Sequence, residues 1–229
     1  MVEFSEAKTL GVTMFPATPT VQIFSEPSAV AARLAEMQLD EQIFVDAFTQ
    51  ANMYRVRLTL HHPRLYRYVV MTQETIAALR DILIPRKWEK KADGNYELVV
   101  NRGLGIAIAV ASGNSGTGNN NITPSNKSRK GCWTIQAIDD NLTADFFPET
   151  LPKQLEEEKL STWILLFNLE KDVIHAELSR PNAYDDTRQY VVSWSERIIL
   201  GSLDLYGEDI PLPISNLPDI DIDITFKEA

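Results

Sequence analysis

The chain contains little cysteine: Cys132 is the only one in 229 residues. A single cysteine cannot close an intramolecular disulfide, which excludes a disulfide-stapled scaffold and favours a reducing compartment. Long apolar runs are absent as well, and the longest, such as residues 163–167, are far too short to span a bilayer. The first residues lack the basic and apolar regions of a secretory signal. These absences predict a soluble cytoplasmic protein without a membrane partner.

Several catalytic signatures are missing too. The sequence has no Gly-x-Ser-x-Gly elbow, which excludes the usual nucleophile turn of an α/β-hydrolase. It has no Cys-x-x-Cys pair, which excludes a zinc nucleobase deaminase. No metal ligand is assigned, and the cofactor stays unknown, with Mg²⁺ expected only if the protein is a nuclease. Whether the protein is an enzyme is left open.

What the chain does contain is an ordinary globular composition, with 44% hydrophobic and 24% charged residues. A chain of this length can bury a substantial core. We expect a single domain over residues 1–229, in which a helical N-terminal subdomain (27–51) could pack on a β-rich body (52–229). No internal repeat and no convincing linker interrupts it.

Helical patterns concentrate in the first third. Two helices are predicted over about 28–39 and 40–51, and a third from Thr72 to the residues before Pro85. Between them, residues 54–60 alternate apolar and polar side chains, which predicts a half-buried strand, and a second strand is possible over 65–71. From Trp88 onward the patterns are those of strands.

The predicted strands form a series. A hairpin joins 88–91 to 96–100 around Asp93-Gly94-Asn95, and residues 105–111 form an apolar central strand. A second hairpin joins 163–167 to 173–178, and further strands cover 190–194, 197–203 and 219–226. The lone Cys132 is interpreted as packing within an apolar strand. The predicted class is α+β, with a few helices in the N-terminal third followed by a mainly antiparallel β-sheet.

Charge is distributed very unevenly. Residues 51–131 carry 13 Lys and Arg against 5 Asp and Glu, whereas residues 132–229 carry 7 against 20. Such polarity can mark a surface for an anion, or it can be neutralised within one fold. It is also suited to head-to-tail contact between copies.

The basic part includes a segment, residues 54–68, with four arginines, three tyrosines, two histidines and no acid. Arginine binds phosphate through bidentate hydrogen bonds, and tyrosine rings offer faces on which bases stack. In a strand, Arg55 and Arg57 would share one face. The predicted contacts are Arg55, Arg57, Arg64, Arg67 and Tyr66. The alternative is that these arginines pair with carboxylates of the C-terminal half.

A second candidate is the loop over residues 112–131, which is rich in Ser, Gly and Asn and ends in Lys127, Arg129 and Lys130. Successive backbone N–H groups in such loops can form an anion nest. The loop lacks the Gly-Lys-Ser/Thr of a Walker A motif, and the residues that follow Gly118, three Asn and then Ile122-Thr123-Pro124, do not open a helix, so triphosphate hydrolysis is not expected. The simplest interpretation is a flexible, exposed loop.

Two carboxylate patterns raise the question of a metal. Glu89 and Lys91 match half of a metal-dependent nuclease site, which would use Mg²⁺, but the nearest upstream Asp81 falls on a predicted helix. His175 and Glu177 lie on one face of a predicted strand with Asp172 nearby. Such short patterns arise easily by chance.

The end of the chain alternates Asp and Ile from Asp219 to Ile224. The carboxylates could bind a divalent cation, protect a sheet edge, or form a surface for a basic partner. The first function hypothesis is binding of a phosphate-bearing ligand, with nucleic acid as the leading candidate. The alternatives are an acidic interaction module or self-assembling homo-oligomer with complementary faces, and a metal-dependent nuclease.

Overall fold

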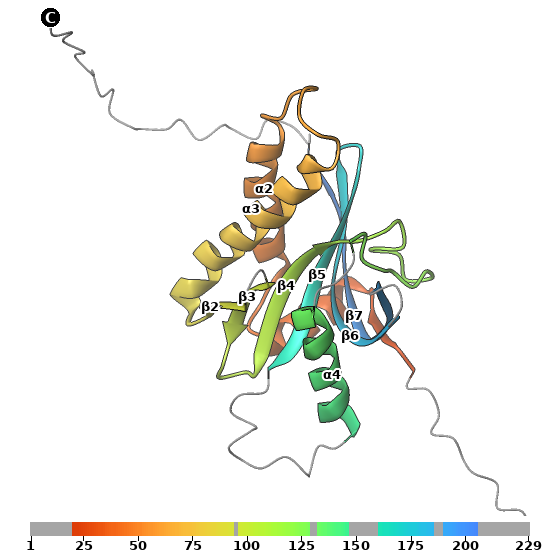
Figure 1. The fold of residues 1–229 in the computed structure, drawn as a ribbon. Coiled ribbons are helices and arrows are strands. Elements are labelled where there is room, and N and C mark those ends of the chain that lie inside the picture. The colour runs from red at the N-terminus through yellow and green to blue at the C-terminus, as the bar shows by residue number, and fades with distance from the viewer. Residues whose placement is uncertain (1–19, 94–95, 129–131, 147–159, 186–189, 206–229) are drawn as a thin grey trace, which may run out of the picture.

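The structure is a computed structural model that describes residues 20–93, 96–128, 132–146, 160–185 and 190–205 (Figure 1). Its centre is a seven-stranded sheet in the order β1-β7-β6-β5-β4-β3-β2. The strands are β1 (Gln22–Phe24), β2 (Glu89–Asp93), β3 (Tyr96–Asn101), β4 (Ile106–Ser112), β5 (Ser161–Glu170), β6 (Val173–Asp185) and β7 (Tyr190–Asp204). The helices in these ranges are α1 (Pro27–Glu36), α2 (Glu41–Arg55), α3 (Tyr66–Leu83) and α4 (Cys132–Phe146), with a 3₁₀ turn at Ile84–Arg86.

The α+β class is confirmed, and two finer points of the prediction are wrong. The sheet is mixed, because β1 pairs with β7 and β4 pairs with β5 in parallel, while the four other pairings are antiparallel. Helices are not confined to the first third, because α4 lies between β4 and β5. A parallel β4–β5 pair needs a crossover connection, and α4 is part of that connection.

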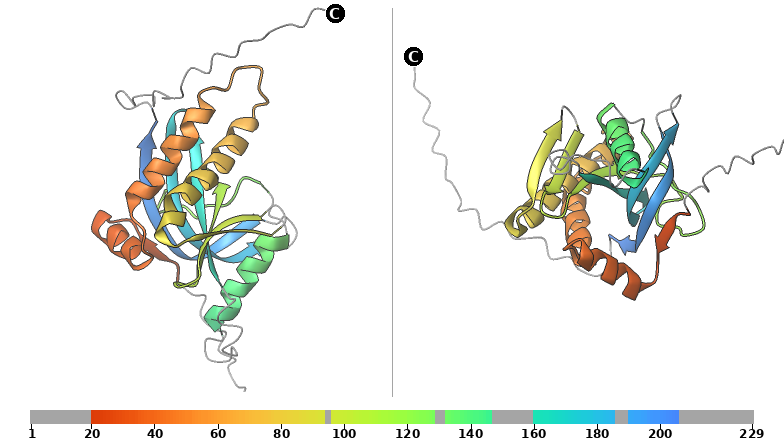
Figure 2. Two further views of the ribbon diagram at one scale, coloured as in Figure 1. Left: turned by 90° about the vertical axis from the view of Figure 1, so that its left-hand side faces the viewer. Right: turned by 90° about the horizontal axis from the view of Figure 1, so that it is seen from below.

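Helices α1, α2 and α3 contribute to the larger core on one side of the sheet, and α2 and α3 pack against each other (Figures 1 and 2). Asp40 caps α2 by accepting a hydrogen bond from the Ile43 N–H at 3.1 Å. Phe48 of α2 is 2% exposed and meets Phe167 of β5 edge-on, with ring centroids 5.8 Å apart. The α2–α3 pair is thereby held on the centre of the sheet.

The opposite face is covered by α4 and by the loop over residues 113–128. Ile138 of α4 packs with Leu166 and Trp194 in a smaller apolar cluster. Asn141, 1% exposed, joins α4 to two strands: its Nδ2 donates to the carbonyls of Thr162 (2.9 Å) and Pro181 (3.0 Å), and its Oδ1 accepts from the Thr162 N–H.

The strand predicted over 54–60 is wrong. Tyr54 and Arg55 close the last turn of α2, and turns follow to His62. Alternation marks a strand only when one side is buried against a sheet, yet Val56 is 48% and Leu60 102% exposed here. Arg55 and Arg57 therefore do not share a strand face.

The possible strand over 65–71 is also wrong, because α3 begins at Tyr66. Met71, Leu79 and Leu83 are fully buried at helical spacing, so packing overrides the β preference of the local tyrosines and valines. Thr72 is not an N-cap; its hydroxyl donates to the Tyr68 carbonyl inside the helix at 2.8 Å.

Later strands agree better with the prediction. The β2–β3 and β5–β6 hairpins and the apolar strand β4 are confirmed, although β5 and β6 are longer than expected. The strands predicted over 190–194 and 197–203 are one strand, β7. Cys132 begins α4 rather than lying in a strand, and residues 219–226 lie outside the described residues. Among the described helices, none is long and apolar enough to cross a membrane.

Candidate nucleic-acid interface

The segment that connects α2 to α3, together with the adjoining ends of both helices, forms a protruding tip. We define this hairpin tip as residues 54–68; in Figure 1 it stands at the top of the molecule, beside the β5–β6 turn. Its fold is set locally by Thr59 and His62: the His62 Nδ1 accepts from the Thr59 N–H at 3.0 Å, and the His62 N–H donates to the Thr59 carbonyl. The compact turn brings the ends of the two helices together.

The hairpin tip encloses an open cavity of about 740 Å³. Its lining is basic and carries no carboxylate; it consists of Arg55, Leu58, Thr59, Leu60, His61, His62, Pro63, Arg64 and Arg67. Three of the four predicted arginines therefore line one cavity. The fourth, Arg57, lies outside it, with its guanidinium 5.6 Å from the centre of the Tyr54 ring.

The arginines differ in how their charges are compensated. Arg55 is mostly buried and bonds Asn52 Oδ1 at 2.6 Å and the carboxylate of Asp172, in the β5–β6 turn, at 3.4 Å. Arg57, Arg64 and Arg67 are exposed, and within the described ranges none of them pairs with a carboxylate. Of the four predicted arginines, only Arg55 is paired with a carboxylate from the described part of the C-terminal half.

Tyr68 joins the hairpin tip to the loop over residues 113–128. The Arg67 guanidinium lies 4.9 Å from the centre of the Tyr68 ring and donates to its hydroxyl at 3.2 Å, and the Lys127 ammonium lies 4.5 Å from the same ring. Lys127 also donates to Asn168 Oδ1 of β5 at 2.8 Å. Two basic residues predicted from separate segments therefore meet across one aromatic ring, whereas Arg129 and Lys130 lie outside the described residues.

The same contacts act on the Tyr68 hydroxyl. Partial burial raises its pKa, but the positive charges of Lys127 and Arg67, with their hydrogen bonds, outweigh this effect and lower the pKa below the ordinary 10.0. The lowered pKa indicates a positive local potential, which is the property that an anion-binding surface requires.

Aromatic and apolar side chains surround the arginines. The rings of His62 and Tyr66 are stacked, with centroids 5.7 Å apart and planes 6° from parallel. Tyr54 and Tyr66 are 49% and 42% exposed, and Leu65 is 74% exposed. Exposed large apolar residues on one protruding segment indicate a contact surface rather than ordinary scatter.

The loop over residues 113–128 is held against the sheet by a buried ion pair. Glu177 and Arg197, with side chains 0% and 3% exposed, approach to 2.6 Å. Arg197 also donates to the carbonyls of Asn119 (2.9 Å) and Ile122 (3.0 Å), and Glu177 accepts from the Gly118 N–H at 2.8 Å. The expectation of an exposed loop is thus wrong for its inner residues.

This anchoring decides what the loop can bind. Gly118 has φ +76° and directs its N–H to a carboxylate of the protein itself, so that amide is not free for a phosphate. Glu177 is equally unavailable as a metal ligand, because its oxygens also accept from Arg197 and Ser179.

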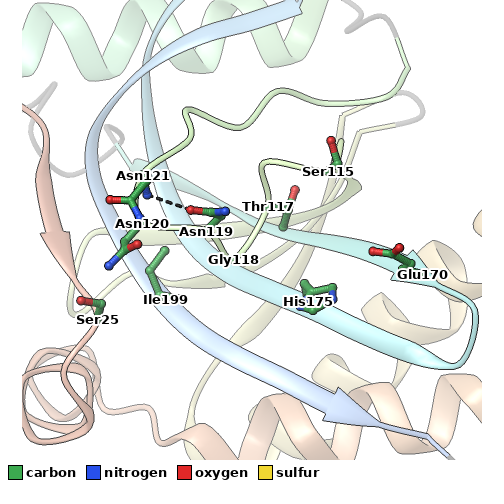
Figure 3. Close-up of a pocket in the computed structure, with 10 residues that line it drawn as sticks. All are labelled: Ser25, Ser115, Thr117, Gly118, Asn119, Asn120, Asn121, Glu170, His175 and Ile199. Carbon is green, nitrogen blue, oxygen red and sulfur yellow. Dashed lines mark hydrogen bonds between the residues drawn. The ribbon is translucent and has the colours of Figure 1, made fainter.

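A second cavity, of about 520 Å³, lies between this loop and the strands β6 and β7 (Figure 3). Its lining is uncharged apart from Glu170 and includes His175; the other residues are Ser25, Ser115, Thr117, Gly118, Asn119, Asn120, Asn121 and Ile199. It contains no Lys or Arg and is therefore poorly suited to phosphate. His175, considered from sequence as a metal ligand, lines this cavity.

Elements of a metal site are not brought together in the described residues. No group of three or more His, Cys, Asp or Glu side chains there is placed to hold an ion. Glu89 lies on the edge strand β2, is exposed, and bonds Arg102 at 3.1 Å. Asp81 lies on α3, as expected from the sequence.

Comparison of the chain with protein-family models, with curated proteins and with solved structures found no match. The chemistry of the hairpin tip therefore rests on its own residues.

Sequence reasoning identified the arginines but missed the partners that define the surface. Tyr68 was one tyrosine among three, and its contact with Lys127 depends on how the loop returns over β5. The Arg55–Asp172 pair depends on the position of the β5–β6 turn. The sequence places Asp172 in a predicted turn, directly after Glu170-Lys171. An acidic side chain exposed at the end of the sheet was the one signal that could have suggested a partner for an arginine.

Proposed function

We propose that this protein binds nucleic acid, with a preference for single strands, through the hairpin tip. The observation that carries the proposal is the cavity lined by Arg55, Arg64 and Arg67, in which no carboxylate of the described residues competes for the guanidinium groups of Arg64 and Arg67. Guanidinium groups bind phosphate oxygens in a bidentate manner, and an open basic cavity can follow a phosphate backbone.

Lys127 extends the basic surface beyond the cavity. Because Lys127 and Arg67 flank Tyr68, the positive surface continues from the hairpin tip towards the end of the loop. A backbone that carries one charge per nucleotide matches an extended row of cations better than an isolated phosphate does.

The exposed rings favour single strands. Base–aromatic stacking contributes roughly 1–3 kcal/mol per base, and it requires bases that are not already paired. Tyr54 and Tyr66 are both exposed beside the arginines, and Arg57 lies over Tyr54. In a duplex the base faces are occupied, so these rings would contribute little.

The test is fluorescence anisotropy with labelled single-stranded DNA, single-stranded RNA and duplex DNA, in a salt series with and without Mg²⁺. We expect the single strands to bind more tightly than the duplex, with affinity that falls as salt rises. Equal affinity for duplex and single strands would contradict the stacking of bases on the exposed tyrosines. The absence of binding at low salt would refute the proposal as a whole.

The variant to use is Arg57→Gln with Arg64→Gln, because both side chains are exposed and neither has a carboxylate partner in the described structure. A matched control is Lys90→Gln with Arg102→Gln, which removes the same charge from exposed positions on and beside the β2–β3 hairpin. Charge reversal at Arg55 is unsuitable, since it would place two carboxylates beside each other at Asp172.

A protein-interaction role is the second candidate, favoured by the exposed Leu60 and Leu65 of the hairpin tip. Burial of apolar surface would drive such contacts, and the uneven charges could orient them. Sedimentation across a salt series, without nucleic acid, separates the two candidates: a change in oligomeric state would favour the interaction module. A nuclease would require cleavage that depends on Mg²⁺ in the binding assay.

A further inference from the structure

The last described strand ends beside the basic cavity. The Leu205 N–H donates to the Asp172 carbonyl at 2.9 Å, and Leu205 is 3% exposed in the main core. The side chain of Asp172 in turn reaches Arg55, which lines the cavity. Whatever follows residue 205 therefore starts next to the hairpin tip.

The chain that follows has the opposite charge. Residues 206–229, which lie outside the described residues, contain six Asp and Glu against one Lys. Three of the acids alternate with isoleucine, at Asp219, Asp221 and Asp223. When extended, such a sequence places its carboxylates on one side and its isoleucines on the other.

The hairpin tip offers a matching mixture of groups. Arg57 and Arg64 lack carboxylate partners in the described structure, and Leu60 and Leu65 are largely exposed beside them. Carboxylates spaced along an extended chain resemble the phosphates of a single strand, and isoleucines can cover exposed leucines. One segment can therefore neutralise the arginines of the hairpin tip and also cover its exposed leucines.

We propose that residues 219–226 bind the hairpin tip of the same molecule and compete there with nucleic acid. The competition with nucleic acid, which is the regulatory part of this proposal, rests on the proposed function. Thirteen residues separate Leu205 from Asp219, a tether that spans up to about 45 Å when extended. A short intramolecular connection of this kind raises the effective concentration of the attached segment to about the millimolar range, so weak contacts suffice to compete.

The experiment uses the full chain with Asp219→Asn, Asp221→Asn and Asp223→Asn. The matched control carries Glu156→Gln, Glu157→Gln and Glu158→Gln, which removes the same three charges from another acidic run. An exposed ion pair is worth roughly a factor of 1.4 to 5, so three pairs together predict roughly 3- to 100-fold tighter binding of a labelled single strand. The control should change affinity less than twofold.

A second readout needs no nucleic acid. In ¹H–¹⁵N spectra, the triple Asn variant should shift the amides of residues 57–67, and the control should not. Unchanged amides and equal affinities would overturn the inference while leaving nucleic-acid binding intact. Shifted amides without any oligonucleotide binding would instead support docking of the segment and refute the proposed function. Shifts that depend on protein concentration would show docking between copies and overturn the intramolecular form.

Discussion

Replacing Glu177 with glutamine tests the anchoring of the loop. Glu177 is fully buried and accepts four hydrogen bonds: two from Arg197 at 2.6 and 3.0 Å, one from Ser179 and one from the Gly118 N–H. Glutamine has nearly the same shape but no charge, and its NH₂ cannot accept. Arg197 would remain buried with its charge uncompensated.

The magnitude follows from that uncompensated charge. Removing one partner of a buried ion pair costs about 3–5 kcal/mol, out of a total stability of about 5–15 kcal/mol for a typical protein. With a urea dependence of about 2.5 kcal/mol/M, the midpoint of unfolding should fall by about 1.2–2 M. The loop itself should open, because Arg197 also holds the carbonyls of Asn119 and Ile122.

The assay is urea unfolding followed by tryptophan fluorescence. Trp194, one of four tryptophans, is fully buried and donates to the Pro124 carbonyl of the same loop at 2.9 Å, so its part of the emission responds to release of the loop. The double variant Glu177→Gln, Arg197→Met removes both charges and should be more stable than the sum of the single changes predicts. A midpoint shift below 0.4 M, or strict additivity, would refute the reasoning.

Three further predictions concern other contacts. Asn141→Leu leaves the Thr162 N–H and two carbonyls unpaired, and we expect a loss of about 2–4 kcal/mol in urea unfolding; a loss below 1 kcal/mol would contradict it. Gly113→Ala would place a Cβ 2.1 Å from the Thr117 hydroxyl, costing about 1–3 kcal/mol, and Thr117→Ala should recover part of it; no recovery would argue against the clash. In an ultraviolet pH titration, Tyr68→Phe should remove the tyrosine with the lowered pKa, and Lys127→Gln should raise that pKa. Because the ionised form is the one favoured in the fold, Tyr68 adds stability above pH 10 that disappears as the pH falls through its folded pKa; an unchanged titration curve would disprove the Lys127 contact.

The strands after Trp88 could be predicted from the sequence, because a strand that is buried on both faces has a recognisable run of apolar residues. The apolar run of β4 and the β5–β6 hairpin around Lys171 agree with the structure. The region of residues 54–71 was misread, since seven alternating residues suit either a strand or the exposed end of a helix. Only the buried spacing of Met71 and Leu79 distinguishes the two, and that spacing is recognised once α3 is placed on the sheet.

The buried ion pair could not have been predicted in the same way. Glu177 and Arg197 lie 20 residues apart, and their contact depends on the β6–β7 register, which shifts between Ala176 and Glu177. The arginines of the hairpin tip were found from composition, because the absence of acids over 15 residues is a local property. Their grouping around one cavity, and the junction with Lys127, follow from tertiary structure.

The most direct test of the nucleic-acid hypothesis is the salt dependence of single-strand binding in Arg57→Gln, Arg64→Gln. Each phosphate contact contributes about 0.7 to the slope of log affinity against log salt for a single strand. Loss of two contacts should lower the slope by about 1.4, while Lys90→Gln, Arg102→Gln leaves it unchanged. Equal slopes in wild type and both variants would contradict binding through the hairpin tip.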